Sequence, residues 1–385
     1  MDSPIFKKEN LETLCYQRAQ TIYGTQLPDE VTDRLQFELE IIEKSGNSNY
    51  LLFLYNLVNT AQKELGALIG PGRGSIGGSL IAYCLGITKV DPLKHDLLFE
   101  RCINPDKLSH LEVWIDVDEK GLAAILRWLE EKNVKIYGGD TLEFEDESDI
   151  GKWKFTTKLV DKNVLSEIKT VLSNIKQTQG IDVNLDDIPI DDSQTFALFQ
   201  KGETDDIFCF DSYVMQQWLK YLHPTTFNDL VILNVMYRPG IEDYIPQMLQ
   251  RKDGKEKIEY PIPTMEKYLN ETYGIVVYQE QIMMLCRLLA DFTRGESDTL
   301  RKALGKKRGN VLSVLKQKFI EGGQRNGYRE STLEKIWKDW EEKGMYAFNK
   351  AHAVSLTWLA YQMAYLKANY PKEFTAVMSE REINY

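Results

Sequence analysis

Several features that mark common protein classes are scarce in this sequence of 385 residues. Its five cysteines are scattered and form no CxxC pair, so neither a zinc site nor a disulfide framework is indicated. No apolar run is long enough to span a bilayer, and Met1 opens onto a polar stretch without the apolar region of a signal peptide. We therefore expect a soluble, cytoplasmic protein with no membrane partner.

Positive charge is also in the minority. The 47 lysines and arginines are outnumbered by 58 aspartates and glutamates, which gives a formal net charge of -11. This balance argues against a generally basic surface for nucleic acid. It does not exclude basic charge that is confined to one groove, an arrangement that is common in polymerases and nucleases.

The first part of the chain has the pattern of a mixed α+β unit. Apolar residues at three- and four-residue spacing predict helices within 7–65 and an amphipathic helix over 121–132. Alternating side chains predict a strand at about 112–118, and residues 134–160 are predicted to form two or three further strands. Together these segments predict a compact unit with a mixed sheet.

The second part of the chain has almost no strand signal. From about Leu165 onward the pattern is helical and is interrupted only by turns. The fold class is therefore α+β, with a sheet domain over residues 1–160 and a large helical domain over 161–385.

A glycine-rich loop, GPGRGSIGGS, covers residues 70–79. Glycines let backbone amides approach a ligand closely, and the short apolar helix that follows would add the positive end of its dipole. Arg73 would contribute a charge-assisted contact and Ser75 a hydroxyl donor. The loop is neither a Walker A motif nor a Rossmann fingerprint. It predicts a site for a triphosphate, and the alternative is a structural turn that merely needs glycine.

Two acidic residues follow on the strand predicted at 112–118. Asp116 and Asp118 are two apart, so they lie on one strand face together with Glu112 and Trp114. Both carboxylates would reach one Mg²⁺ ion, whereas two-metal phosphoryl transfer needs a third carboxylate. The alternative is a pair of solvated acids. The candidates for the third carboxylate are Glu143, Glu145, Asp149 and Asp161.

Basic residues gather in the segment LRKALGKKRG over residues 300–309. Lys302 and Lys306 are four apart and so share one helix face. On an acidic protein this segment predicts a local patch for phosphates or a nucleic-acid backbone, and the alternative is an ordinary solvated face. Its basic residues are Arg301, Lys302, Lys306, Lys307 and Arg308.

Polar residues also interrupt an otherwise apolar helical stretch near the C-terminus. The segment AFNKAHAV, residues 347–354, contains Lys350 and His352, which are both candidates for phosphate contact. A lone histidine is more often a structural residue, so that alternative stays open for His352.

Taken together, these stretches resemble the catalytic core of the alpha subunit of bacterial DNA polymerase III, a family C replicative polymerase. The resemblance covers about residues 10–380 and rests on several motifs in the same order. These are GPGRGSIGGSL, DPLKHDLLFERCINP, IPIDD, YRPG, the run from TYGIVVYQEQ through LLADFTRGESDTLRKALGKK, FNKAHAV and AYLKANYPKEF. The family's fold implies a palm similar to polymerase β nucleotidyltransferases, followed by helical fingers.

The resemblance also implies roles for individual residues. Gly74 and Ser75 would line the triphosphate of the incoming nucleotide. Ala351 stands where the family usually has serine. Basic positions of the fingers motifs are matched by Arg301, Lys302, Lys306, Lys307, Lys350 and His352.

The metal-binding positions depart from the family. When the strand is aligned without gaps, its two metal-binding aspartates fall on Trp114 and Asp116, so one is lost. A two-residue insertion would restore the pair as Asp116 and Asp118. The family's third aspartate falls on Lys158, or on Thr156 in a shifted match, and neither side chain binds Mg²⁺.

Whole segments of the family are missing as well. The stretch between the two strand sites is far shorter than in the family, where it carries a thumb that grips duplex DNA. The PHP domain, the clamp-binding motif and the carboxy-terminal domains also have no counterpart in this sequence.

These observations predict a catalytically degenerate polymerase core that retains palm and fingers. Its expected partners are a nucleoside triphosphate, nucleic acid, or a protein of the replication or defence machinery. One alternative is an active minimal nucleotidyltransferase that uses Mg²⁺ at Asp116 and Asp118. Another is a scaffold that acts only through protein interactions.

Overall fold

The computed structural model describes residues 10–109, 111–132, 134, 136–137, 141–146 and 153–383. Its N-terminal part begins with α1 (Leu11–Tyr23), α2 (Asp29–Lys44) and α3 (Ser48–Lys63), so the helices predicted within 7–65 are present. These helices form because their apolar residues recur at helical spacing and are buried on one side.

A four-stranded mixed sheet follows. Its strands are β1 (Glu112–Val117), β2 (Ile136–Tyr137), β3 (Thr141–Asp146) and β4 (Trp153–Asp161), in the order β1-β4-β3-β2. The pair β1–β4 is parallel and the other pairs are antiparallel, which confirms the α+β class and the mixed sheet. The parallel pair needs a crossover connection, and α5 (Glu119–Glu131) supplies its helix.

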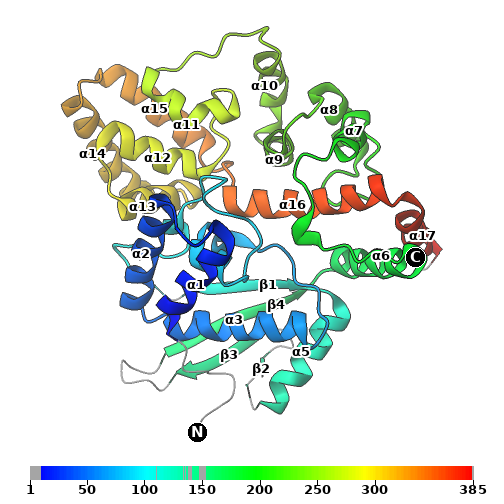
Figure 1. Ribbon diagram of the computed structural model, residues 1–385. Helices are drawn as coiled ribbons and strands as arrows, with labels where there is room; N and C mark the ends of the chain where they lie inside the picture. The colour runs from blue at the N-terminus through cyan, green and yellow to red at the C-terminus, as the bar shows by residue number, and fades with distance from the viewer. Residues whose placement is uncertain are drawn as a thin grey trace.

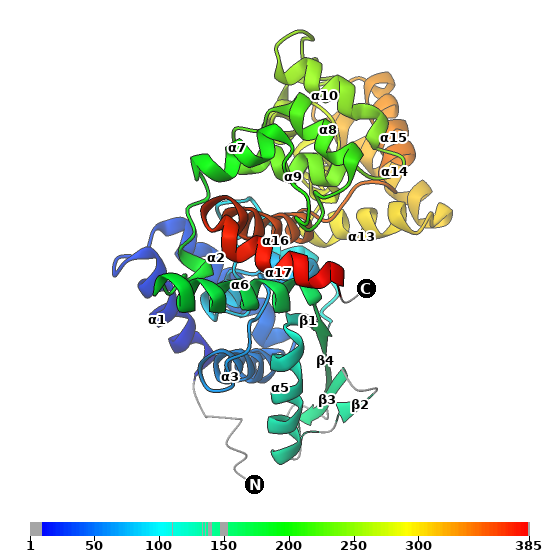
Figure 2. The ribbon, with the colours of Figure 1, turned by 90° about the vertical axis from the view of Figure 1, so that its right-hand side faces the viewer.

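The two faces of β1 have different environments. Figure 2 shows α3 and α5 on one side of the sheet, and the buried side chains of Val113, Ile115 and Val117 belong to the same apolar cluster as residues of these two helices. Trp114 and Asp116 alternate with them and lie on the opposite face. That opposite face carries the residues that the sequence assigns to chemistry.

The remainder of the chain is helical, as predicted. Short 3₁₀ segments lie between several of its helices, and α16 crosses the middle of the molecule between the sheet and the other helices (Figure 1). The helices are α6 (Asn163–Gln179), α7 (Ser193–Lys201), α8 (Tyr213–Leu222), α9 (Phe227–Met236), α10 (Ile245–Lys252), α11 (Glu266–Leu269), α12 (Gln279–Ala290), α13 (Arg294–Gly305), α14 (Gly309–Arg325), α15 (Glu330–Lys343), α16 (Lys350–Asn369) and α17 (Pro371–Ile383).

Buried apolar side chains of the described residues form three clusters. One joins α1–α3 and α5 with β1, one joins α6–α10 with α16 and α17, and one holds α11–α15 together. Val90 and Leu97 come from the N-terminal part but belong to the second cluster, so the sheet unit and the helices share packed surface. None of the described helices combines the length and apolar character that a bilayer crossing requires.

Candidate functional site

The glycine loop lies against the end of β1. The amide of Gly70 donates to the carbonyl of Asp116 at 2.8 Å, and residues Gly74–Gly78 form a 3₁₀ turn, η1. Gly74 has a φ of 73°, a left-handed conformation that favours glycine. At Gly78, a Cβ atom would lie 2.5 Å from the carbonyl oxygen of Leu98, so this position has no room for a side chain. The loop therefore needs glycine for its backbone path and for close packing.

The helix after the loop, α4 (Leu80–Cys84), does not offer its N-terminus to a ligand. The buried carboxylate of Glu38 accepts hydrogen bonds from the Ser79 hydroxyl at 2.7 Å and from the amides of Leu80 and Ile81 at 2.9 and 3.1 Å. Arg34 pairs with the same carboxylate at 2.6 Å. The carboxylate of Glu38 thus occupies the position at the N-terminus of α4 that a phosphate group would need. The expectation that α4 attracts a triphosphate is therefore wrong.

His352 contacts the glycine loop directly. Its Nδ1 atom accepts a hydrogen bond from the amide of Gly74 at 3.2 Å, and its ring stacks on Phe348. Burial, together with the positive charges of Arg73, Arg238 and Lys162, lowers the pKa of His352 to about 4. The imidazole is therefore neutral at physiological pH and acts here as an acceptor that holds the loop.

Two cations beside His352 were not identified as site residues from the sequence. The Arg238 guanidinium lies 3.8 Å from the Phe348 ring centroid, and its buried Nε has no hydrogen-bond partner among the described residues. The Lys162 ammonium lies 4.6 Å from the ring centroid of Phe208. Arg238 belongs to the YRPG turn, so that motif was the available signal, whereas Lys162 follows β4 without any motif.

The two candidate metal ligands have other partners. Asp116 is 3% exposed and pairs with Arg73 at 2.9 Å. Asp118 lies beyond the end of β1 and is the N-cap of α5, where it accepts from the amide of Gly121 at 3.0 Å. It also accepts from the Leu68 amide at 2.6 Å and pairs with Lys169 at 2.8 Å.

The predicted shared face of four residues is therefore wrong for Asp118, because β1 ends at Val117 and the carboxylate of Asp118 turns to the helix end. Backbone amides and a lysine satisfy this carboxylate, as is usual for an N-cap. Its contacts explain its presence without a metal ion.

Trp114 and Lys158 lie side by side on β1 and β4. They are direct partners in the parallel register, and the Lys158 ammonium lies 5.4 Å from the centroid of the indole ring. The Arg73 guanidinium lies 5.3 Å from the same centroid, and the indole Nε1 donates to Glu112 at 2.9 Å. The two positions that the alignment assigns to lost aspartates are thus neighbours, and the indole between them contacts two cations.

This donor set does not fit a pair of Mg²⁺ ions. In the part of the chain that the structure describes, no group of three His, Cys, Asp or Glu side chains has the geometry of a metal site. Asp149 lies outside the described residues, and so do the side chains of Glu143, Glu145, Asp161 and Thr156. Carboxylate oxygens are the ligands that Mg²⁺ prefers, and the two described candidates are paired with Arg73 and Lys169.

Among the basic residues predicted in the segment 300–309, two have a buried acidic partner and the others are exposed. Arg301 and Lys302 both pair with the buried Asp298, at 2.7 and 2.6 Å, and Asn104 donates to the same carboxylate at 3.0 Å. Lys306 and Lys307 are exposed at the end of α13. Ser75 lies in η1, where its carbonyl oxygen accepts from the Cys102 thiol.

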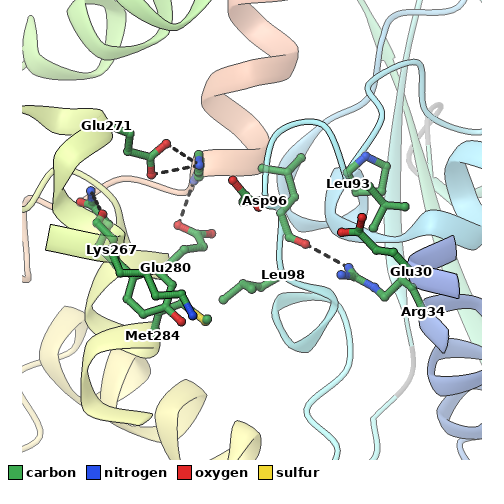
Figure 3. A pocket seen from close by; sticks show the side chains of 14 residues that line it. Glu30, Arg34, Leu93, Asp96, Leu98, Lys267, Glu271, Glu280 and Met284 are labelled. Atoms are coloured by element: carbon green, nitrogen blue, oxygen red, sulfur yellow. Dashed lines mark hydrogen bonds and ion pairs between the residues drawn. The ribbon is translucent and has the colours of Figure 1, made fainter. Parts of the chain in front are cut away.

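Lys350 lies on the first turn of α16, like His352. Its side chain lines a pocket, whereas His352 contacts the glycine loop. The Lys350 ammonium pairs with both oxygens of Glu271, at 3.0 and 2.8 Å, and its amide donates to Glu280 at 3.0 Å. Figure 3 shows Glu271 and Glu280 converging on this position at the wall of a pocket of about 310 Å³. Both acidic and basic side chains line the pocket. The positive charge of Lys350 is balanced by its ion pair with Glu271.

Comparison with known proteins identifies relatives of this chain. Residues 9–184 match the bacterial DNA polymerase III alpha NTPase domain, and residues 164–327 match the finger domain of the same subunit. The chain is 31% identical to the DNA polymerase III subunit alpha of Aquifex aeolicus, over 98% of this chain and 44% of that protein. It is likewise 31% identical to the subunit of Halalkalibacterium halodurans, over 97% of this chain and 43% of that protein.

The chain spans less than half the length of these relatives. The alignment with the Aquifex aeolicus protein extends over 512 positions, which exceeds the 385 residues of this chain, so that relative has internal residues without a counterpart here. The matched domains, their order and the identity over nearly the whole chain place it in the family of the bacterial DNA polymerase III alpha subunit.

Proposed function

We propose that this protein is a polymerase III alpha-like core that binds the phosphates of a nucleoside triphosphate but does not transfer nucleotides. In this proposal residues 1–160 are the palm-like unit, residues 161–385 are the fingers-like unit, and the internal residues found only in relatives include the thumb. The observation that carries the proposal is the Trp114–Lys158 pair at the positions aligned with two metal-binding aspartates.

The physical argument against catalysis concerns charge. The family normally uses Mg²⁺, and two-metal catalysis needs carboxylates that neutralise cations a few ångströms apart. Here an indole and a lysine replace two of the carboxylates, while Asp116 is paired with Arg73. Losing a single electrostatic group in an active site costs about 3–4 kcal/mol, or about 10²–10³ in rate. Two losses and a third engaged carboxylate remove the basis for metal-assisted transfer.

The argument for binding concerns the loop and its neighbours. Gly74 of the glycine loop has a left-handed backbone, and Gly78 packs closely against the backbone of residue 98. At the edge of the loop lies His352, which is within the electrostatic influence of Arg73, Lys162 and Arg238. Arginine and lysine beside glycine-rich backbone are the groups that recognise phosphate. This arrangement supports a nucleotide site, with a nucleic-acid strand or a protein of the replication or defence machinery as a further partner.

Two measurements on the full chain test this proposal. Primer extension on a short primed template, with Mg²⁺ or Mn²⁺ and all four dNTPs, is expected to give no product. Equilibrium dialysis at low salt is expected to show binding of radiolabelled dATP.

The controls separate the alternatives. Extension that disappears in Asp116→Ala would contradict the proposal and support an active minimal nucleotidyltransferase. If a folded chain binds neither dATP nor a short DNA, the proposal fails, and a pure interaction scaffold is the explanation that stands.

A further inference from the structure

Positively charged side chains lie around the glycine loop, at the place where the palm of the family carries metal-binding carboxylates. Resting on the proposed function above, we propose that this site binds phosphate groups in their metal-free form, with the protein's own cations in place of divalent ions. The ligand class is therefore a free polyphosphate or a terminal phosphate of a nucleic acid, and the site prefers either of them without Mg²⁺.

The first part of the site is the sheet face. Arg73 and Lys158 lie 5.3 and 5.4 Å from the centroid of the Trp114 ring, so two cations gather over one side chain. The indole is 37% exposed, and the Arg73 side chain is 29% exposed. Glu112 is bonded to the indole nitrogen, and Asp116 is bonded to Arg73. These two carboxylates offset part of the positive charge, and among the described side chains they belong to no group with the geometry of a metal site.

The second part of the site is the edge formed by α16 and the YRPG turn. His352 holds the amide of Gly74, and the charges of Arg73, Arg238 and Lys162 all act on this ring. The buried Nε of Arg238 has no partner among the described residues, although a guanidinium normally uses its donors. A phosphate group is the ligand that would match the positive charge of Arg238 and of the cations around it.

Charge determines the preference for a metal-free ligand. A bound Mg²⁺ ion cancels two negative charges of a triphosphate and also brings a cation close to lysine and arginine side chains. Like charges at short range repel, and the fewer charges left on the ligand attract the site less strongly. Mg²⁺ is therefore expected to weaken binding here, whereas it is part of the catalytic complex in an active two-metal polymerase.

The test compares affinities with and without the metal. Isothermal titration calorimetry of the full chain with dATP, inorganic triphosphate and a 5′-phosphorylated oligonucleotide is carried out in EDTA and in excess Mg²⁺, at matched ionic strength. We expect affinity for dATP and triphosphate to fall about tenfold on adding Mg²⁺, since one charge-assisted contact accounts for about that factor. Tighter binding of the oligonucleotide than of dATP would identify a nucleic-acid end as the source of the phosphate.

Variants assign the effect to the named cations. Lys158→Gln and Arg238→Gln are each expected to lose about tenfold in affinity in EDTA. Lys120→Gln, an exposed lysine at the start of α5, is the matched control and is expected to keep the wild-type affinity. Equal melting temperatures of the variants and the wild type show that folding is not the cause of any loss.

Each outcome has a distinct meaning. If dATP binds more tightly in Mg²⁺ than in EDTA, the metal-free preference is wrong while nucleotide binding stands. If Lys158→Gln and Arg238→Gln bind as well as Lys120→Gln, the assigned site is wrong. If none of the three ligands binds in either condition, both this inference and the proposed function fail.

Discussion

Trp114 has contacts that differ in kind from those of a metal-binding carboxylate. Its indole nitrogen donates to Glu112, and its ring lies beside the charged ends of Arg73 and Lys158. An exposed cation–π contact contributes about 0.5–1 kcal/mol, so the ring holds the two cations in place without neutralising them. At the scale of the residue, an indole at position 114 contacts positively charged side chains, whereas a carboxylate there would offer oxygen ligands for a metal ion.

Glu38 is the residue whose loss we expect to be most destabilising in the N-terminal unit. Glu38→Ala leaves the Arg34 guanidinium, the Ser79 hydroxyl and two amides of α4 without their buried partner. Breaking a buried pair in this way costs about 3–5 kcal/mol. Urea unfolding followed by circular dichroism measures the loss.

The matched control for this prediction is on the same helix. Glu40 pairs with Lys44 on the exposed side of α2, and both side chains are about 60% exposed. Glu40→Ala is expected to change stability by less than about 1 kcal/mol, because exposed ion pairs contribute little. Equal effects of the two substitutions would show that the Glu38 cap does not support α4.

His352 gives a prediction that depends on pH. Its pKa in the folded protein is about 4, below the ordinary value of 6.5, so between these values the unfolded chain binds a proton that the folded chain does not. Its contribution therefore makes the folded state less stable as pH falls from about 6.5 toward 4, and adds no pH dependence above that range. Histidine ring NMR signals should show His352 neutral down to about pH 5.

The variant His352→Gln tests the assignment of that effect. Glutamine keeps an acceptor for the Gly74 amide but does not titrate, so the variant is expected to lose less stability between pH 6.5 and 4 than the wild type. His95, whose pKa is also lowered to about 4 by burial, contributes the same trend in both proteins. A His352 signal that titrates near pH 6.5 would contradict the buried, neutral ring.

At the scale of elements, ion pairs connect the segment 99–106 of the sheet unit with α12 and α13. Glu100 is 1% exposed and pairs with Arg287 and Arg294 at 3.1 and 2.9 Å, while Arg101 pairs with Glu280 at 3.0 Å. Arg287 and Arg294 come from helices that are nearly two hundred residues away in the sequence. These ion pairs therefore add to the apolar packing between the two units.

Glu100→Gln should loosen this contact. The change leaves two partly exposed arginines facing a neutral amide, so we expect the α12–α13 region to unfold about 1–3 kcal/mol more easily than in the wild type. Differential scanning calorimetry is expected to show a separate, earlier transition. Glu334→Gln, which alters an exposed pair with Lys316, serves as the control, and identical scans for the two variants would contradict the role of Glu100.

The sequence predicted elements better than contacts. The helices within 7–65, the strand at β1 and the helical second part follow from local apolar periodicity, which is a property of neighbouring residues. The capping role of Asp118 was missed because the alternating pattern of the strand continues to residue 118, although β1 ends at Val117 and Asp118 begins the next helix as its N-cap. The contact between Gly74 and His352 joins residues that are 278 positions apart, so no local pattern encodes it.

At the scale of the whole molecule, charge is distributed unevenly. The chain carries a net charge of -11, yet Arg73, Lys158, Lys162 and Arg238 gather around one loop between the sheet and α16. A local positive site on an acidic protein attracts phosphate at short range and repels long polyanions from the rest of the surface. This distribution favours a small ligand or a strand end over continuous contact with duplex DNA.

The parallel register of β1 and β4 has a further consequence for redesign of this sheet. Trp114 lies opposite Lys158, and Asp116 is two residues along the same strand, so the spacing of the three positions is intact. Neighbouring strands lie about 4.8 Å apart, so side chains at paired positions of one face are close neighbours. Carboxylates introduced at both positions, by Trp114→Asp and Lys158→Asp, would therefore lie with Asp116 on one face of the sheet.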